Sequence, residues 1–249
     1  MRMLGIIGTG LIGSSIGLAA RARGWTVLGY DADASASKTA RDVTAIDRPA
    51  TRDEVYAECA IVVIAVPVRA TIEEVSALRD RRLRGDQLVL DTASVKAAVA
   101  EAADGLRAFV PTHPMAGSER SGPLAARSDL FEDRTWCVVP TENEERTKRA
   151  IAFVEDLGAH AVPIGAAEHD RVVALTSHVP QLFAFAFARR IAERSSGGEA
   201  IEALCGPAGR ELLRLGRSSA AMWEQIFAEN AEAIGFELER LWRTMSQKA

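Results

Sequence analysis

Apolar residues fall into short continuous runs along the first two thirds of the chain, and polar segments separate the runs. The runs occupy residues 3–8, 25–31, 59–67, 87–91, 108–114, 134–140 and 159–165. Continuous apolar runs of this length are typical of parallel strands that are buried on both faces. Helical patterns occupy residues 8–24, 97–103 and 143–157. Strands that alternate with helices predict a parallel α/β sheet covered by helices on both faces.

The pattern changes after residue 165. The segments 167–195, 199–216 and 219–245 carry helical patterns without a strand signal. We therefore predict two domains, an α/β domain at 1–165 and an all-helical domain at 166–249. The helical domain is small for a free-standing hydrophobic core, so its apolar surface should pack on the first domain or on a second copy of the chain.

Composition narrows the class of protein. The chain has 249 residues, of which 48% are hydrophobic and 26% charged, and its net charge is −4. This balance argues against a nucleic-acid partner or a membrane-surface partner, and no apolar run is long enough to span a bilayer. Cys59, Cys137 and Cys205 lie far apart and form no CxxC motif, so we expect no disulfide framework, no metal site and a cytoplasmic location.

The first apolar run ends in GTGLIG, a GxGxxG pattern built from Gly8, Gly10 and Gly13. The pattern follows a predicted strand and opens a predicted helix, which is the context of a Rossmann-type dinucleotide site. Gly8 would permit the tight turn, Gly10 would let a pyrophosphate approach the backbone, and Gly13 would let the helix pack on the strand. The alternative is a tight strand–helix turn that binds nothing.

Asp31 closes the second apolar run and can accept hydrogen bonds from the ribose hydroxyls of an adenosine. Because Ala32 follows it and not an arginine, the sequence favours NAD over NADP; Lys38, the nearest downstream cation, leaves NADP open. The predicted cofactor-binding residues are Gly8, Gly10, Leu11, Ile12, Gly13, Asp31, Val66 and Pro67.

Two polar segments, DTASVK (91–96) and THPMAGSE (112–119), follow predicted strands and should lie at the edge of the sheet where ligands bind. A neutral imidazole at His113 could accept a hydroxyl proton during hydride transfer, or could be a loop histidine bonded to a backbone carbonyl. Ser94 could cap the following helix and still offer its hydroxyl to His113 or to the substrate. Lys96 is expected on the helix surface; if it points inward instead, it would supply positive charge near a carboxylate or the cofactor.

A series of motifs gives the chain a family resemblance. In order, the chain contains GTGLIGSS, YDAD, AVPV, DTASVK, HPMAGSERSG, EHDRVVALTSHVP and GRELLRLGRSSAAMWEQIFAEN. This series resembles the prephenate/arogenate dehydrogenase family of tyrosine biosynthesis over nearly the whole chain. The glycine pattern is common to many dehydrogenases, whereas the combination of HPMAGSE, DTASVK and MWEQIF is much more specific.

The resemblance implies an NAD-dependent oxidative decarboxylation of prephenate to 4-hydroxyphenylpyruvate, or of arogenate to tyrosine. In that chemistry His113 would accept the proton of the ring hydroxyl, and Ser94 would orient His113 and the hydroxyl. Arg214 would bind a substrate carboxylate, and Glu119 would gate access to the pocket. The family also implies a homodimer that forms through the helical domain.

Some positions depart from the family pattern or leave alternatives open. The family's SHLPH is SHVPQ here, which retains His178 but places Gln181 where a second pocket histidine is common. This change keeps arogenate open as the substrate. His169 and Asp170 match a family pair near the substrate, or they cap a helix or join the two domains.

Two other classes of protein compete with this family. A β-hydroxyacid dehydrogenase or an imine reductase would place an acid/base lysine on the second domain, where this chain has only Lys248. A non-enzymatic NAD-binding module would need the glycine loop and Asp31 but not His113.

Overall fold

The computed structural model describes residues 2–118, 120–195 and 201–247. Backbone contacts divide the chain into two compact units, Met1–His169 and Asp170–Ala249. The division falls within helix α7 (Ala166–Val173), four residues beyond the change of pattern in the sequence.

The first unit is built on a six-stranded sheet in which every neighbouring pair is parallel. Its strands are β1 (Met3–Ile7), β2 (Thr26–Tyr30), β3 (Arg48–Pro49), β4 (Ile61–Ile64), β5 (Leu88–Asp91) and β6 (Phe109–Val110). The order β3-β2-β1-β4-β5-β6 reverses direction between β1 and β4. The carboxyl ends of these two strands are where a sheet of this topology forms a ligand crevice. The predicted Rossmann-type α/β class is confirmed.

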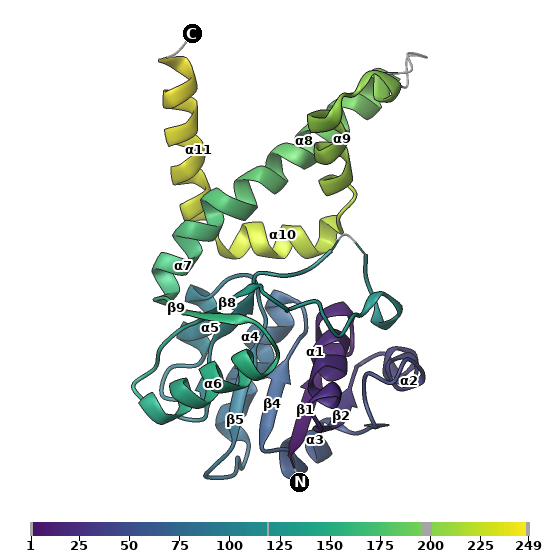
Figure 1. The fold of residues 1–249 in the computed structure, drawn as a ribbon. Coiled ribbons are helices and arrows are strands. Elements are labelled where there is room, and N and C mark those ends of the chain that lie inside the picture. Colours follow the sequence, from purple (N-terminus) through teal and green to yellow (C-terminus); the bar gives the residue numbers. More distant parts are fainter. Residues whose placement is uncertain (1, 119, 196–200, 248–249) are drawn as a thin grey trace. The chain divides into compact units, whose positions relative to one another are not determined.

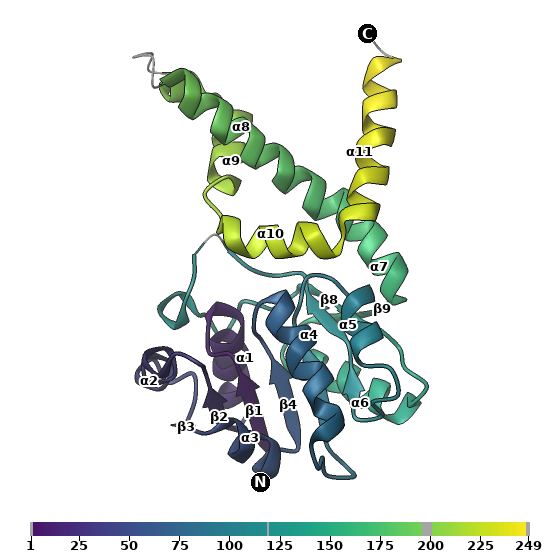
Figure 2. The same cartoon turned by 180° about the vertical axis from the view of Figure 1, so that it is seen from behind.

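Helices cover both faces of this sheet. They are α1 (Leu11–Ala22), α2 (Ala34–Asp42), α3 (Arg52–Glu58), α4 (Val68–Ala77), α5 (Ala97–Ala102) and α6 (Glu144–Asp156), with 3₁₀ turns at Leu78–Asp80 and Pro123–Ala125. Along β1, Leu4 and Ile6 join one core cluster with Ile16 of α1. Gly5 faces the other way, where a Cβ would lie 2.4 Å from Val55 of α3. Figure 1 shows α1 and α6 in front of the sheet, and Figure 2 shows α4 and α5 on the opposite face.

The apolar run at 108–114 was expected to be one strand, but it divides between two sheets. β6 ends at Val110, and β7 (Thr112–Pro114) begins a second sheet with β8 (Thr135–Val138) and β9 (His160–Pro163). β7 is antiparallel to β8, and β8 is parallel to β9. Pro111 separates the two strands, because proline has no N–H to continue the ladder of β6. The carbonyl of Pro111 accepts instead from Val139 N at 2.9 Å.

The second unit is helical. Its elements are a π-helical turn (Ala174–His178), α8 (Val179–Ser195), a 3₁₀ turn (Ile201–Leu204), α9 (Pro207–Leu215), α10 (Ala220–Glu229) and α11 (Ala231–Ser246). The predicted helix at 219–245 breaks at Asn230, whose φ of −122° and ψ of 26° are not helical. The predicted helix at 199–216 is shorter, since α9 begins at Pro207; residues 199 and 200 lie outside the described part of the chain.

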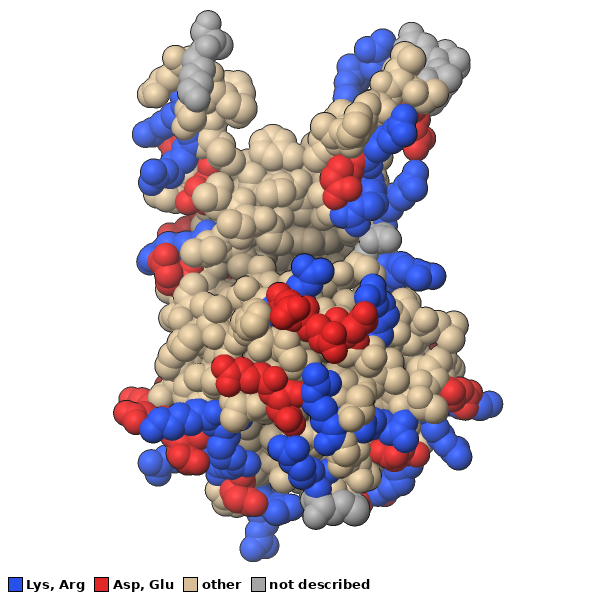
Figure 3. Space-filling view, in the orientation of Figure 1, with Lys and Arg blue, Asp and Glu red and all other residues tan. Residues whose placement is uncertain are grey.

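The helical unit has a small core. Ala174, Val179 and Ile234 form its buried cluster, while Phe236 and Trp242 of α11 are 54% and 69% exposed. Figure 3 shows uncharged residues over the surface between α8 and α11, and basic and acidic side chains interspersed over the first unit. Among the described residues, no helix combines the length and the hydropathy of a membrane span.

Candidate active site

The glycine loop joins β1 to α1 and has three glycines with different constraints. Gly8 has a φ of +96°, in the left-handed region that glycine favours, and a Cβ there would lie 2.4 Å from the carbonyl oxygen of Ala65. A Cβ on Gly13 would lie 1.9 Å from the carbonyl oxygen of Gly8. A Cβ on Gly10 would meet nothing within 4 Å. The backbone at Gly10 is therefore open to a ligand. Gly10 is the N-cap of α1 and provides no side-chain hydrogen bond to the first helical turn, whose N–H groups can bind an anion.

Asp31 holds this loop against the end of β2. Its Oδ2 accepts hydrogen bonds from Thr9 N at 2.7 Å and Thr9 Oγ1 at 3.2 Å, and its Oδ1 accepts from Asp33 N at 3.0 Å. The carboxylate is thus fixed in orientation and remains partly exposed. Fixed carboxylate oxygens beside a glycine loop fit the hydroxyls of an adenosine ribose.

A cavity of about 520 Å³ lies along this edge of the sheet. Among its lining residues are Gly8, Gly10, Asp31, Val66 and Pro67, all expected to bind the cofactor. Leu11, Ile12 and Gly13 instead form the first turn of α1. An open approach at Gly10, a helix N-terminus and a pinned carboxylate fit an adenine dinucleotide in this cavity.

Tyr30, Arg52 and Glu74 are among the lining residues that the sequence analysis did not predict as part of the site. Arg52 begins α3, where Thr51 and Glu54 form a reciprocal capping box. The motif TRDE carries the sequence signal of this helix start, and it could have placed Arg52 near the carboxyl ends of the strands. Glu74 lies on α4 and is 6% exposed, a buried charge that no sequence pattern marks.

His113 lies at the centre of β7, where it pairs with Cys137 of β8. Its side chain is buried, and its Nδ1 lies 2.9 Å from Nε2 of His169, with the two rings inclined at 70°. One of these nitrogens donates and the other accepts. His169, which the sequence left between several roles, is therefore a direct hydrogen-bond partner of His113.

A buried ion pair fixes the backbone beside His113. Lys96 and Asp91 are both fully buried and in contact. Lys96 Nζ also donates to the carbonyl of Thr112 at 2.8 Å, and Asp91 accepts from Thr112 N at 2.8 Å and from Ala93 N at 2.9 Å. The expectation of a surface lysine is wrong, and the alternative of an inward lysine near a carboxylate holds, because Asp91 at the end of β5 compensates the ammonium inside the protein.

Ser94 and Glu119 complete the predicted residues of the first unit. Ser94 is half-buried in the segment between β5 and α5. The expectation that it caps α5 is wrong, because the helix begins at Ala97 and Lys96 occupies the cap position. Glu119 lies outside the residues that the structure describes, as does Lys248.

Arg214 lies on α9 of the helical unit. Its Nε and Nη2 donate to the two carboxylate oxygens of Glu211 at 2.9 Å and 2.6 Å. This bidentate pair lowers the pKa of Glu211, chiefly through the hydrogen bonds from Arg214. The guanidinium side chain is 46% exposed and is held in one orientation on the helix surface.

Gln181 and His178 have buried polar partners within the helical unit. Gln181 Nε2 donates to the carbonyl of Leu215 at 2.8 Å and so ties α8 to the end of α9. His178 Nδ1 lies 3.1 Å from Nδ2 of Asn230, and its ring contacts Trp223 edge to face with centroids 5.9 Å apart. Both side chains therefore hold neighbouring helices together.

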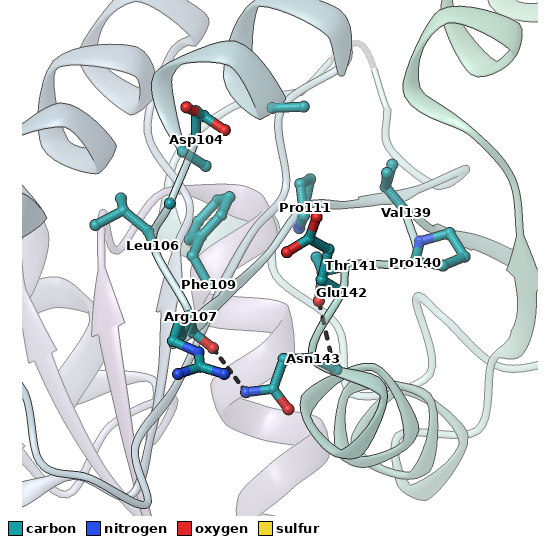
Figure 4. A pocket seen from close by; sticks show the side chains of 13 residues that line it. Asp104, Leu106, Arg107, Phe109, Pro111, Val139, Pro140, Thr141, Glu142 and Asn143 are labelled. Carbon is teal, nitrogen blue, oxygen red and sulfur yellow. Dashed lines mark hydrogen bonds between the residues drawn. The ribbon is translucent and has the colours of Figure 1, made fainter.

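A second cavity of about 320 Å³ lies beside the start of β6 and the loop before α6 (Figure 4). Asn143 in its wall donates to the carbonyl of Arg107 at 3.1 Å and accepts from Arg146 N at 3.2 Å. The predicted site residues do not line it. These contacts connect the start of α6 to the loop between α5 and β6.

A sheet with this strand order, a glycine loop of this geometry and a pinned aspartate define an NAD-binding domain of the kind found in dehydrogenases. Comparison with protein families gives the specific assignment. Residues 16–163 match the family model described as "Prephenate dehydrogenase, nucleotide-binding domain", and residues 165–248 match "Prephenate dehydrogenase, dimerization domain". The chain belongs to the prephenate dehydrogenase family. NAD is its cofactor, and the glycine loop lies ahead of the matched range.

Known proteins support the assignment over the full chain. A protein of Streptomyces niveus named "Probable prephenate dehydrogenase NovF" is 36% identical over 99% of this chain and 67% of its own length. A cyclohexadienyl dehydrogenase of Zymomonas mobilis is 34% identical over 93% of this chain and 82% of its own. The structure of prephenate dehydrogenase from A. aeolicus with hydroxyphenyl propionate and NAD⁺ superposes with a TM-score of 0.90 at 27% identity, covering 99% of this chain and 89% of that chain.

Proposed function

We propose that the protein catalyses the NAD-dependent oxidative decarboxylation of prephenate or arogenate, and that His113 accepts the proton of the ring hydroxyl. The observation that carries this proposal is the fixed position of His113, between a strand ladder, a buried ion pair and His169. When bound, NAD⁺ supplies the acceptor for the hydride that leaves C4 of the ring. The hydroxyl proton passes to His113, and the carboxylate at C1 leaves as CO₂, so that its bonding electrons complete the aromatic ring. The resulting phenolate oxygen then recovers the proton from His113.

The contact with His169 supports one tautomer of His113 as the competent base. When Nδ1 of His113 carries the proton, it donates to Nε2 of His169, and Nε2 of His113 has the lone pair needed to accept a proton. After proton transfer the imidazolium still donates to His169. His169 is in our proposal the positioning residue that selects this tautomer, and Ser94 orients the hydroxyl.

For the substrate carboxylate we propose Arg214. Its planar guanidinium already binds the two oxygens of Glu211, which is the geometry that a substrate carboxylate would also require. His178, Gln181 and Glu119 remain proposed substrate-binding residues. Because the Gln181 amide donates to a backbone carbonyl and carries no charge, we propose that the site accepts both the keto and the amino side chain. The cyclohexadienyl relative supports a substrate range of this kind.

We further propose a homodimer formed through the helical unit. Its core is small, and Phe183, Phe236 and Trp242 are 47%, 54% and 69% exposed. Large exposed apolar side chains on a unit with a small core support burial against a second copy. The matched family model of this region is a dimerization domain. We retain a cytoplasmic location as a proposal, supported by three free and buried cysteines.

The test is a turnover assay with purified protein, NAD⁺ and either prephenate or arogenate, followed by NADH absorbance. We expect NADH with at least one substrate, with 4-hydroxyphenylpyruvate or tyrosine as the product. The ratio of kcat/KM for the two substrates sets the preference. A folded protein that binds NAD⁺ but forms no NADH with either acid would overturn the proposed reaction. Light scattering at several protein concentrations tests the dimer, and a monomer at every concentration would contradict it.

A further inference from the structure

The cavity of about 520 Å³ beside the glycine loop is called the dinucleotide cavity below. Arg52 is the one basic residue among the described residues that line it. It shares the cavity wall with three carboxylates, Asp31, Glu73 and Glu74. A wall of this charge opposes an additional phosphate, whereas the guanidinium would attract one. What Arg52 contacts therefore decides which adenosine the cavity accepts.

The guanidinium of Arg52 is held from two sides. Its Cζ lies 5.0 Å from the centroid of the Tyr30 ring, and Nη2 lies 3.5 Å from the tyrosine hydroxyl. Its Nε forms an ion pair with Oε2 of Glu74 at 3.4 Å. The side chain is 42% exposed, so a flat ligand can reach it.

Glu74 is itself fixed. It is 6% exposed and accepts a hydrogen bond from the hydroxyl of Tyr56 at 3.0 Å through Oε1. Burial and the negative charge of Glu74 raise the pKa of Tyr56, so Tyr56 remains a donor. Glu74 thus presents its second oxygen to Arg52 and compensates the charge of the guanidinium.

We propose that Arg52 binds the adenine base of NAD by stacking. Glu74 compensates the positive charge of Arg52, so that this charge does not attract a 2′-phosphate. A planar guanidinium stacks on aromatic faces. Arg52 can therefore stack on the adenine base while Glu74 compensates its charge. A 2′-phosphate would require Arg52 to leave Glu74 and would meet the carboxylate of Asp31. The pair formed by Arg52 and Glu74 is then a second determinant of NAD over NADP, in addition to Asp31. This inference rests on NAD as the cofactor and not on the identity of the oxidised acid.

The first experiment measures binding by calorimetry without substrate, with AMP and NAD⁺ as probes. Arg52→Gln should weaken both by about fivefold to tenfold, the range of one base-stacking contact. Arg52→Lys should lose as much, because it keeps the charge and lacks the planar face. Arg48→Gln is the matched control: Arg48 lies on β3, pairs with Glu54 and Glu58, and does not line the cavity, so its AMP affinity should be unchanged.

The second experiment compares AMP with adenosine 2′,5′-bisphosphate. Glu74→Gln keeps an acceptor for Tyr56 but removes the charge that faces Arg52, so the affinity ratio should shift about tenfold toward the bisphosphate. Arg52→Gln in the same background should abolish this shift. Unchanged AMP affinity in a stable Arg52→Gln, full affinity in Arg52→Lys, or an unchanged ratio in Glu74→Gln overturns the proposal. All of these are measured without turnover, so a failure of the proposed reaction leaves them unaffected.

Discussion

Replacing Lys96 with methionine tests whether the buried ion pair holds the loop that carries His113. The substitution keeps the length of the side chain and removes the ammonium. Asp91 would retain two of its three donors, the N–H groups of Ala93 and Thr112 at 2.9 Å and 2.8 Å. The carbonyl of Thr112 would lose the donor that lies at 2.8 Å.

The magnitude follows from leaving a carboxylate buried without its cation. Breaking a fully buried pair by removing one partner costs about 3–5 kcal/mol, and a protein of this size shows this as a fall of roughly 10 °C in Tm. Replacing Asp91 with asparagine at the same time removes the stranded charge. The double variant should therefore be more stable than Lys96→Met alone, with a coupling energy of about 2 kcal/mol or more.

Urea unfolding followed by tryptophan fluorescence is a suitable assay, because Trp25 and Trp136 are buried in the first unit. The matched control is Lys148→Met, which breaks an ion pair with Glu144 in which both side chains are largely exposed. That variant should unfold as the wild type does. A loss below about 1 kcal/mol for Lys96→Met, or strictly additive single substitutions, would refute the view that this ion pair fixes the loop.

Three further predictions concern the site. His113→Asn should lower kcat by about 10²–10⁴-fold with little change in KM, measured by NADH formation, and a retained kcat would remove His113 from the proton transfer. Arg214→Gln should raise KM for the acid about tenfold or more while NAD⁺ binding stays constant; an unchanged KM would place the carboxylate elsewhere. Gly10→Ala should fold normally and weaken NAD⁺, since its Cβ meets only open space, whereas Gly8→Ala should lower Tm because of its φ of +96° and its contact with Ala65. Equal melting temperatures for the two glycine variants would contradict that distinction.

The sequence predicted the strands of the sheet well, because parallel strands buried on both faces are continuous apolar runs. The sequence analysis did not predict three helices: α2 and α3, which lie between β2 and β4, and α4, which follows β4. In α2 the buried positions are Ser37 and Ala40, and in α4 they include Thr71 and Glu74. Polar residues at core-facing positions remove the apolar period on which a helix prediction depends. The short strand β3 has two residues and carries no pattern of its own.

The candidate site also has residues that the sequence could locate and residues that it could not. The glycine loop and Asp31 could be located because each residue type has a specific backbone or hydrogen-bonding reason to be there. The partners of His113 could not, since a buried lysine such as Lys96 looks like a surface residue in the sequence, and its burial depends on a carboxylate five positions earlier. The contact with His169 joins residues 56 positions apart, and only folding brings them together.

Two aspartates solve the same physical problem at two places on the sheet. Backbone ladders end where parallel strands end, so the loops beyond them lose their hydrogen-bond partners. Asp31 at the end of β2 accepts from the backbone N–H of Thr9, in the loop after neighbouring β1. Asp91 at the end of β5 accepts from the N–H of Thr112, in the segment after neighbouring β6. Each carboxylate therefore adds one hydrogen bond between the end of a strand and the segment after the neighbouring strand. The two segments fixed in this way carry the glycine turn and His113.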